Sequence, residues 1–86
     1  MKTFKDLKFK QHPSADGIIS RITFDNGYGA SVVRHEYSYG GKDGLYEVAV
    51  LDSEGHLTYA TSVTDDVIGY LRPEDVTDVI EKIQQL

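Results

Sequence analysis

Residues 18–33 read IISRITFDNGYGASVV, and this stretch predicts a β-hairpin. Polar and apolar side chains alternate over Ile18–Phe24, which is typical of a strand with one buried face. Asn26-Gly27 follows, and this pair favours a two-residue type I′ turn because both central residues need a positive φ. Such a turn places Ile22 opposite Ser31 and sets which side chains of the second strand face the core.

Working outward from this hairpin, we expect further strands at Gly29–Tyr39, Leu45–Leu51 and His56–Thr61, separated by glycine-containing turns. A register that pairs Tyr37 with Val48 joins these strands into one sheet. One face then collects most of the large apolar side chains and is the expected core face: Ile18, Ile22, Phe24, Val33, Tyr37, Val48, Val50 and Tyr59. The other face is more polar but also carries Val32, Ala49 and Leu51.

The C-terminal residues 73–86 predict an amphipathic helix. Pro73 suits the first helical position. Apolar side chains repeat at helical spacing and form one stripe, which we expect to cover the apolar face of the sheet: Val76, Val79, Ile80, Ile83 and Leu86. Residues 1–17 read as a lysine-rich leader and a loop. Residues 63–72 are compatible with either a short strand or a capped helical turn.

These elements predict one α+β domain over residues 1–86. Its residues 18–61 form an antiparallel, meander-like sheet of about four strands, and the C-terminal helix packs on one face. The composition fits a folded domain, with 40% hydrophobic and 27% charged residues. The chain has no cysteine, which excludes disulfides and thiol chemistry and fits a reducing cytoplasm. No stretch resembles a signal peptide or a membrane span.

Charge is distributed unevenly along the chain. The net charge of −5 divides into +2 on residues 1–43 and −7 on residues 44–86. An acidic half of this kind disfavours general binding to phosphate backbones and is compatible with docking onto a basic partner.

No motif predicts catalysis, a metal site or a cofactor. The glycine-rich residues 40–44 precede an expected strand, whereas a phosphate-binding loop needs a helix directly after it. His12, His35 and His56 lack the spacing that metal sites favour. Asp65-Asp66 is better suited to capping a turn than to acid–base work. We therefore expect no enzymatic activity.

Six of the nine aromatic residues are tyrosines, and they give the best functional hypothesis. Tyrosine is enriched where proteins bind other proteins, although it also lines the rim of small cores. Tyr39 and Tyr46 flank the glycine-rich turn. We expect a partner-binding site around this turn, made by Arg34, Tyr39, Lys42, Tyr46 and Glu47. Changing Tyr39 and Tyr46 to alanine should then weaken binding without unfolding the domain.

Other functions stay open on the sequence alone. Arg21 and Arg34 could combine with the tyrosines to bind single-stranded nucleic acid. A small enzyme of unknown reaction is a third alternative. A homodimer is also compatible with the sequence, because Val32, Ala49 and Leu51 add apolar area to the second sheet face.

Three segments, residues 24–34, 44–50 and 64–71, resemble small bacteriophage and prophage proteins, and the resemblance spans nearly the whole chain. It implies a phage-related origin, a bacterial cytoplasm and no catalytic residues. It also implies that the expected interaction module modulates a protein of the bacterial host.

Overall fold

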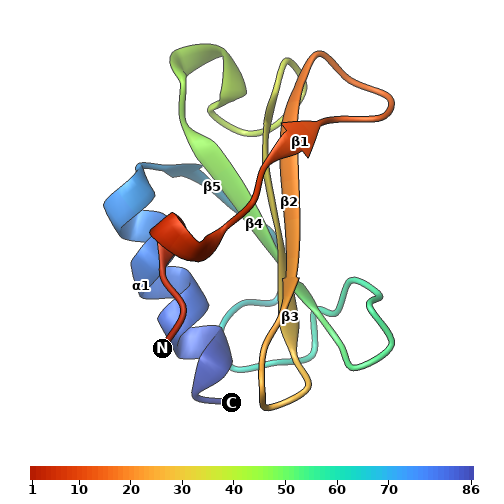
Figure 1. The fold of residues 1–86 in the computed structure, drawn as a ribbon, viewed down its shortest axis with the longest axis vertical. Helices are drawn as coiled ribbons and strands as arrows, with labels where there is room; N and C mark the ends of the chain where they lie inside the picture. The colour runs from red at the N-terminus through yellow and green to blue at the C-terminus, as the bar shows by residue number, and fades with distance from the viewer.

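The computed structural model describes residues 1–86 and contains one antiparallel sheet with a helix packed against it (Figure 1). The strands follow the order β1-β2-β3-β4-β5, so the predicted α+β meander is confirmed, with five strands instead of about four. The elements are β1 (Lys10–Gln11), β2 (Gly17–Thr23), β3 (Gly29–His35), β4 (Tyr46–Leu51), β5 (Ile68–Leu71) and α1 (Pro73–Gln84), with short 3-10 helices at Phe4–Asp6 and Gly41–Asp43.

Helix α1 covers one face of the sheet, as its apolar stripe predicts (Figure 1). Pro73 occupies its first turn, and the Asp75 carboxylate accepts a hydrogen bond from the Arg72 backbone N–H at 3.0 Å. The helix buries Val76, Val79, Ile80 and Ile83 against the sheet. At 12 residues, α1 falls short of a membrane span, and no other helix reaches that length and apolarity.

The β2–β3 hairpin differs from the predicted two-residue turn by one residue. Phe24 pairs with Tyr28 across a three-residue loop, in which only Gly27 has a positive φ, of 91°. The side-chain amide of Asn26 donates to the backbone O of Ile83 at 2.8 Å and ties the turn to the end of α1. Asn26 therefore acts as a link to the helix, and its backbone does not adopt the type I′ conformation.

This one-residue difference turns the side chains of β3 to the faces of the sheet opposite to those predicted. Ser20 pairs with Val32, so the prediction that Val33 and Tyr37 face the core is wrong. Val32 is fully buried beneath α1 instead, next to Val48, its partner on β4. The prediction for the core face of β2 and β4 is confirmed for most residues, and the buried sheet residues of the core are Phe24, Ala30, Val32, Tyr46, Val48 and Val50.

Strand β3 ends at His35, four residues earlier than predicted. The Ser38 hydroxyl accepts the His35 N–H and donates to the His35 C=O, both at 2.9 Å. These bonds occupy backbone groups that a longer strand would offer to its neighbour, and the chain turns away. The predicted pairing of Tyr37 with Val48 is therefore wrong, and Tyr37 and Tyr39 lie in the β3–β4 connection.

The predicted strand at His56–Thr61 is also wrong, since only Leu57 forms an isolated bridge, to Leu51. Three threonine hydroxyls at positions 58, 61 and 64 each accept the backbone N–H two residues later. Such local bonds favour turns over strand pairing. The place beside β4 is taken by β5, so part of the undecided segment 63–72 is a strand.

The first seventeen residues contribute to the fold more than a leader would. Strand β1 extends the sheet beside β2, and Leu7 is buried in the core. Both termini lie at the same end of α1 (Figure 1). There, the Lys2 N–H donates to Oε1 of Gln84, and Nε2 of Gln84 donates to the Lys2 carbonyl, both at 2.8 Å.

Candidate functional site

Three large aromatic side chains are exposed around the β3–β4 connection and β5. Tyr37 is 80% exposed, Tyr39 58% and Tyr70 63%. We call these three residues the tyrosine surface. A tyrosine that the fold does not bury presents a large, rigid apolar area with a polar tip, which is the kind of side chain enriched at binding hot spots.

Tyr70 reaches this surface because β5 contains a bulge. Tyr46 pairs with Leu71 and Val48 pairs with Ile68, so Gly69 and Tyr70 together lie opposite a single β4 residue. The backbone of Tyr70 has a φ of 58°, the only positive φ of a non-glycine residue in the chain. A bulky side chain in this region is an outlier, and bulges commonly redirect side chains at functional sites.

Close backbone packing holds Tyr70 against the β3–β4 connection. The Tyr70 N–H donates to the Tyr39 carbonyl at 3.1 Å. A Cβ on Gly69 would lie 2.2 Å from the Tyr39 Cβ, and a Cβ on Gly40 would lie 3.0 Å from the Tyr70 Cα. Both positions therefore require glycine, and the two tyrosine rings stack with centroids 6.4 Å apart and planes at 28°.

A hollow of about 300 Å³ lies beside the stacked rings. The Tyr39 N–H donates to Oε2 of Glu47 at 2.7 Å, which joins the β3–β4 connection to β4. The hollow is lined by Glu36, Ser38, Tyr39, Gly40, Lys42, Asp43 and Tyr70. It combines two aromatic rings with two carboxylates and one ammonium group, and a third carboxylate, that of Glu47, is bonded to the backbone of Tyr39 at its edge.

The structure brings together three of the five residues predicted for the site. Tyr39 and Lys42 line the hollow and Glu47 supports it. Tyr46 is only 7% exposed and lies in the core, so an alanine there would test folding and not binding. The Arg34 guanidinium lies 5.2 Å from the centre of the Tyr46 ring, and its Nη1 donates to the Tyr46 hydroxyl at 3.2 Å.

Sequence reasoning missed Tyr37 and Tyr70 as members of the surface. Tyr37 was assigned to the core face by the wrong register. Tyr70 lies in a segment that the sequence left undecided, and its position depends on contacts of Gly69 with Tyr39, thirty residues away. The only local signal is a glycine directly before an aromatic residue within a short apolar run, which is compatible with a bulge.

His12 and His35 are neighbours in space, with ring centroids 4.8 Å apart. Nδ1 of His12 accepts the Ser14 N–H, and Nδ1 of His35 accepts the Tyr37 N–H, both at 3.1 Å. Each ring thereby shapes its own loop and uses a nitrogen lone pair that a metal would need. The chain has no group of three or more histidine, aspartate or glutamate side chains arranged to hold a metal ion.

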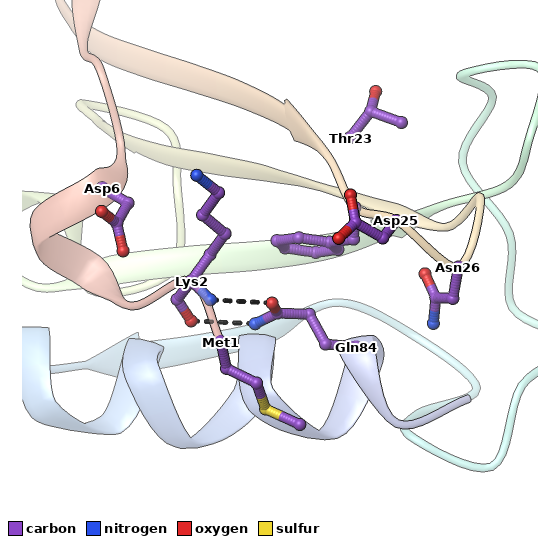
Figure 2. A pocket seen from close by; sticks show the side chains of 8 residues that line it. Met1, Lys2, Asp6, Thr23, Asp25, Asn26 and Gln84 are labelled. Atoms are coloured by element: carbon purple, nitrogen blue, oxygen red, sulfur yellow. Dashed lines mark hydrogen bonds between the residues drawn. The ribbon is translucent and has the colours of Figure 1, made fainter.

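A larger hollow, of about 450 Å³, lies between the N-terminal residues, the β2–β3 turn and α1 (Figure 2). Several of its polar groups are engaged within the fold: the Lys2 backbone bonds to the Gln84 side chain, and Asp6 accepts the Thr3 N–H at 2.8 Å. That hydrogen bond is the main cause that lowers the pKa of Asp6 below its usual value. The only aromatic residue that lines this hollow, Phe24, is buried, whereas the exposed Tyr39 and Tyr70 line the smaller hollow, which is therefore the better candidate.

Comparisons with family models, with curated proteins and with solved structures found no match to this chain. The class of the protein is therefore defined by its own fold and surface. It is a small α+β domain with a five-stranded meander, one covering helix and an exposed tyrosine surface.

Proposed function

We propose that this protein is a non-enzymatic protein–protein interaction module that binds its partner through the tyrosine surface. The observation that carries the proposal is the stacked pair of Tyr39 and Tyr70, exposed on the surface while the backbone of Tyr70 has a positive φ. From the resemblance to small phage proteins, we further propose that the partner is a host protein in the bacterial cytoplasm.

Two energetic arguments support a binding role. A bulky residue with a positive φ costs on the order of 1 kcal/mol or more, and such strain clusters at functional sites. Glycine at position 70 would remove that cost, yet the chain carries a tyrosine there. The exposed ring also gives up the free energy that its burial in a core would provide. A binding partner that covers both rings would recover it.

Nucleic-acid binding has less support from the geometry. Side chains alternate along the strands, so Arg21 on β2 and Arg34 on β3 lie on opposite faces of the sheet. Arg34 is engaged with Tyr46, and the Arg21 guanidinium donates to the Gly55 carbonyl. Neither arginine lines the hollow beside Tyr39 and Tyr70, so they do not form a joint stacking and phosphate-binding groove with it.

A homodimer through the second sheet face has little support, because the apolar residues from which it was expected are not exposed there. Val32 faces α1 instead of the second face. Ala49 and Leu51 do lie on that face, but both are buried within the single chain. The apolar area from which the homodimer was expected is therefore already largely covered.

The proposal is tested by tagged capture from a bacterial lysate, with nuclease treatment, read by mass spectrometry. The test variant is Tyr39→Ala with Tyr70→Gly, which removes both rings and leaves the backbone at position 70 unstrained. The matched control is Tyr59→Ala, because Tyr59 is also half exposed but lies outside the tyrosine surface. Circular dichroism and thermal unfolding confirm that all three proteins are folded.

We expect one protein to be recovered in stoichiometric amount by the wild type and by Tyr59→Ala, and to be lost from the double variant. Equal recovery by all three proteins would mean that the tyrosine surface is not the binding site. Recovery that disappears with nuclease would move the function to nucleic-acid binding.

A further inference from the structure

We infer that the hollow beside Tyr39 and Tyr70 receives a cationic side chain, preferentially an arginine, from a basic segment of the partner. The inference rests on the proposed function and deepens it by naming the chemistry of the partner. It is carried by the charges, the aromatic faces and the ion pairing of the residues around the hollow.

The hollow has an excess of unpaired negative charge. Glu36 and Asp43 line it with one cation, Lys42, and the Glu47 carboxylate lies next to it beneath the Tyr39 N–H. The chain has three ion pairs, and all of them lie elsewhere, at His56 and Arg72. Glu36 accepts the Asp16 N–H at 3.4 Å, as Glu47 accepts the Tyr39 N–H, but no cation of the chain pairs with these carboxylates, so their charge is available to a cation from outside.

The aromatic rings favour the same sign of charge. The faces of tyrosine rings carry negative electrostatic potential and attract ammonium and guanidinium groups within about 6 Å. Tyr39 and Tyr70 present such rings next to the carboxylates. The molecule already contains one contact of this kind, because Arg34 lies 5.2 Å from the centre of the Tyr46 ring.

Other partner chemistries fit less well. An anionic group would meet the carboxylates of Glu36 and Asp43 and a chain with a net charge of −5. A purely apolar group would remove those carboxylates from water without pairing them, at a large cost in free energy. A guanidinium combines both requirements, since it stacks on aromatic faces and pairs with carboxylates in a bidentate geometry, whereas an ammonium group is a point charge.

The test uses a defined probe, so that it does not depend on identifying the natural partner. The isotopically labelled protein is titrated with a tetra-arginine peptide at low salt, and binding is followed by NMR amide shifts. Tetra-lysine and tetra-glutamate peptides serve as comparisons. We expect the shifts to concentrate at Gly40, Lys42, Gly69 and Tyr70, with tetra-arginine binding more tightly than tetra-lysine and tetra-glutamate causing no shifts.

A matched pair of variants separates this hollow from general electrostatic attraction. Glu36→Gln with Asp43→Asn neutralises two carboxylates that line the hollow, and Asp65→Asn with Asp66→Asn neutralises two exposed carboxylates outside it. Both variants change the net charge equally. We expect the first to raise the dissociation constant for tetra-arginine about fivefold and the second to change it less than about twofold.

Two results would overturn the inference: shifts that are absent or spread over the acidic helix, and equal weakening by both neutralised variants. The inference and the proposed function can also fail separately. A captured protein that is lost from the Tyr39/Tyr70 variant but unaffected by Glu36→Gln with Asp43→Asn would leave the binding module intact and refute the cationic ligand. Specific tetra-arginine binding without any captured protein would support the cationic site and count against the proposed binding of a partner protein.

Discussion

Tyr46 and Tyr70 lie on neighbouring strands, yet the fold treats their side chains in opposite ways. Tyr46 is buried on the core face of β4, where its ring contacts Phe4 and Phe9 at centroid distances of 5.1 and 5.6 Å. Tyr70 lies on β5, one residue from the partner of Tyr46, and is mostly exposed. The alternation of the sheet places the first ring, whereas an irregularity in the sheet places the second.

This difference indicates two kinds of residue in one small sheet. The buried aromatic group stabilises the fold, and the exposed pair is held in place at a cost to it. Variants of the first group should therefore change the free energy of unfolding, and variants of the second should change binding. The first comparison below tests that division directly, and the others test the register, the backbone and the turns that produce it.

The largest effect is expected from Tyr46→Ala compared with Tyr39→Ala. Removing the buried Tyr46 ring leaves a cavity beside Phe4 and Phe9 and should lower the free energy of unfolding by about 3–5 kcal/mol. Removing the exposed Tyr39 ring should lower it by less than about 1 kcal/mol. Urea unfolding followed by circular dichroism measures both. Similar losses for the two variants would contradict the division between them.

A second pair tests the register that places these residues. Val32→Thr buries a hydroxyl beneath α1 and should cost about 1–3 kcal/mol of unfolding free energy. Val33→Thr adds the same hydroxyl on the opposite, partly exposed face and should cost less than about 0.5 kcal/mol. Equal unfolding midpoints, or a larger loss at Val33, would favour the two-residue turn that the sequence alone predicts.

The same register shows what sequence reasoning could and could not predict. The stripe of Val76, Val79, Ile80 and Ile83 was predicted because its periodicity lies within one helix. The turn at Asn26 was not, because its side chain bonds to Ile83, 57 residues away. A register is a relation between strands, and a loop that is longer by one residue turns the side chains of the next strand, here β3, to the opposite faces of the sheet.

The candidate site was predicted in part for a related reason. Tyr39 and Lys42 could be found because they flank a glycine-rich turn. Tyr46 was misplaced because nothing local distinguishes a buried tyrosine from an exposed one on the same strand. The end of β3 depends on the Ser38 hydroxyl, which competes with strand pairing for the backbone of His35. That competition is settled by the whole sheet and not by the local sequence.

A smaller effect is expected at Tyr70 itself. Tyr70→Gly and Tyr70→Ala both remove the ring, but only glycine adopts a positive φ without strain. The glycine variant should therefore be more stable than the alanine variant by about 1 kcal/mol, and neither should retain partner binding. Thermal and urea unfolding give the first quantity, and capture from lysate gives the second. An alanine variant as stable as glycine would show that the backbone of Tyr70 is not strained.

The smallest effect is expected from acid, and it concerns the carboxylates that hold the fold's turns. Hydrogen bonds from the Arg72 N–H to Asp75, and from the His56 N–H to Asp52, are the main causes that lower the pKa of each carboxyl below its usual value. A carboxyl with a lowered pKa in the folded protein stabilises it above the unfolded pKa of about 4, and this contribution is lost as the pH falls through the folded pKa.

Stability should consequently decrease below about pH 4, and Asp75→Asn should reduce that dependence because asparagine does not titrate. Urea unfolding of both proteins at pH 7 and pH 3 measures the difference. Asp78→Asn is the matched control, since Asp78 lies on the same helix but its side chain forms no hydrogen bond or ion pair. If Asp78→Asn reduced the acid dependence as much as Asp75→Asn, the net charge of the helix would be the cause, and the hydrogen bond at its first turn would not.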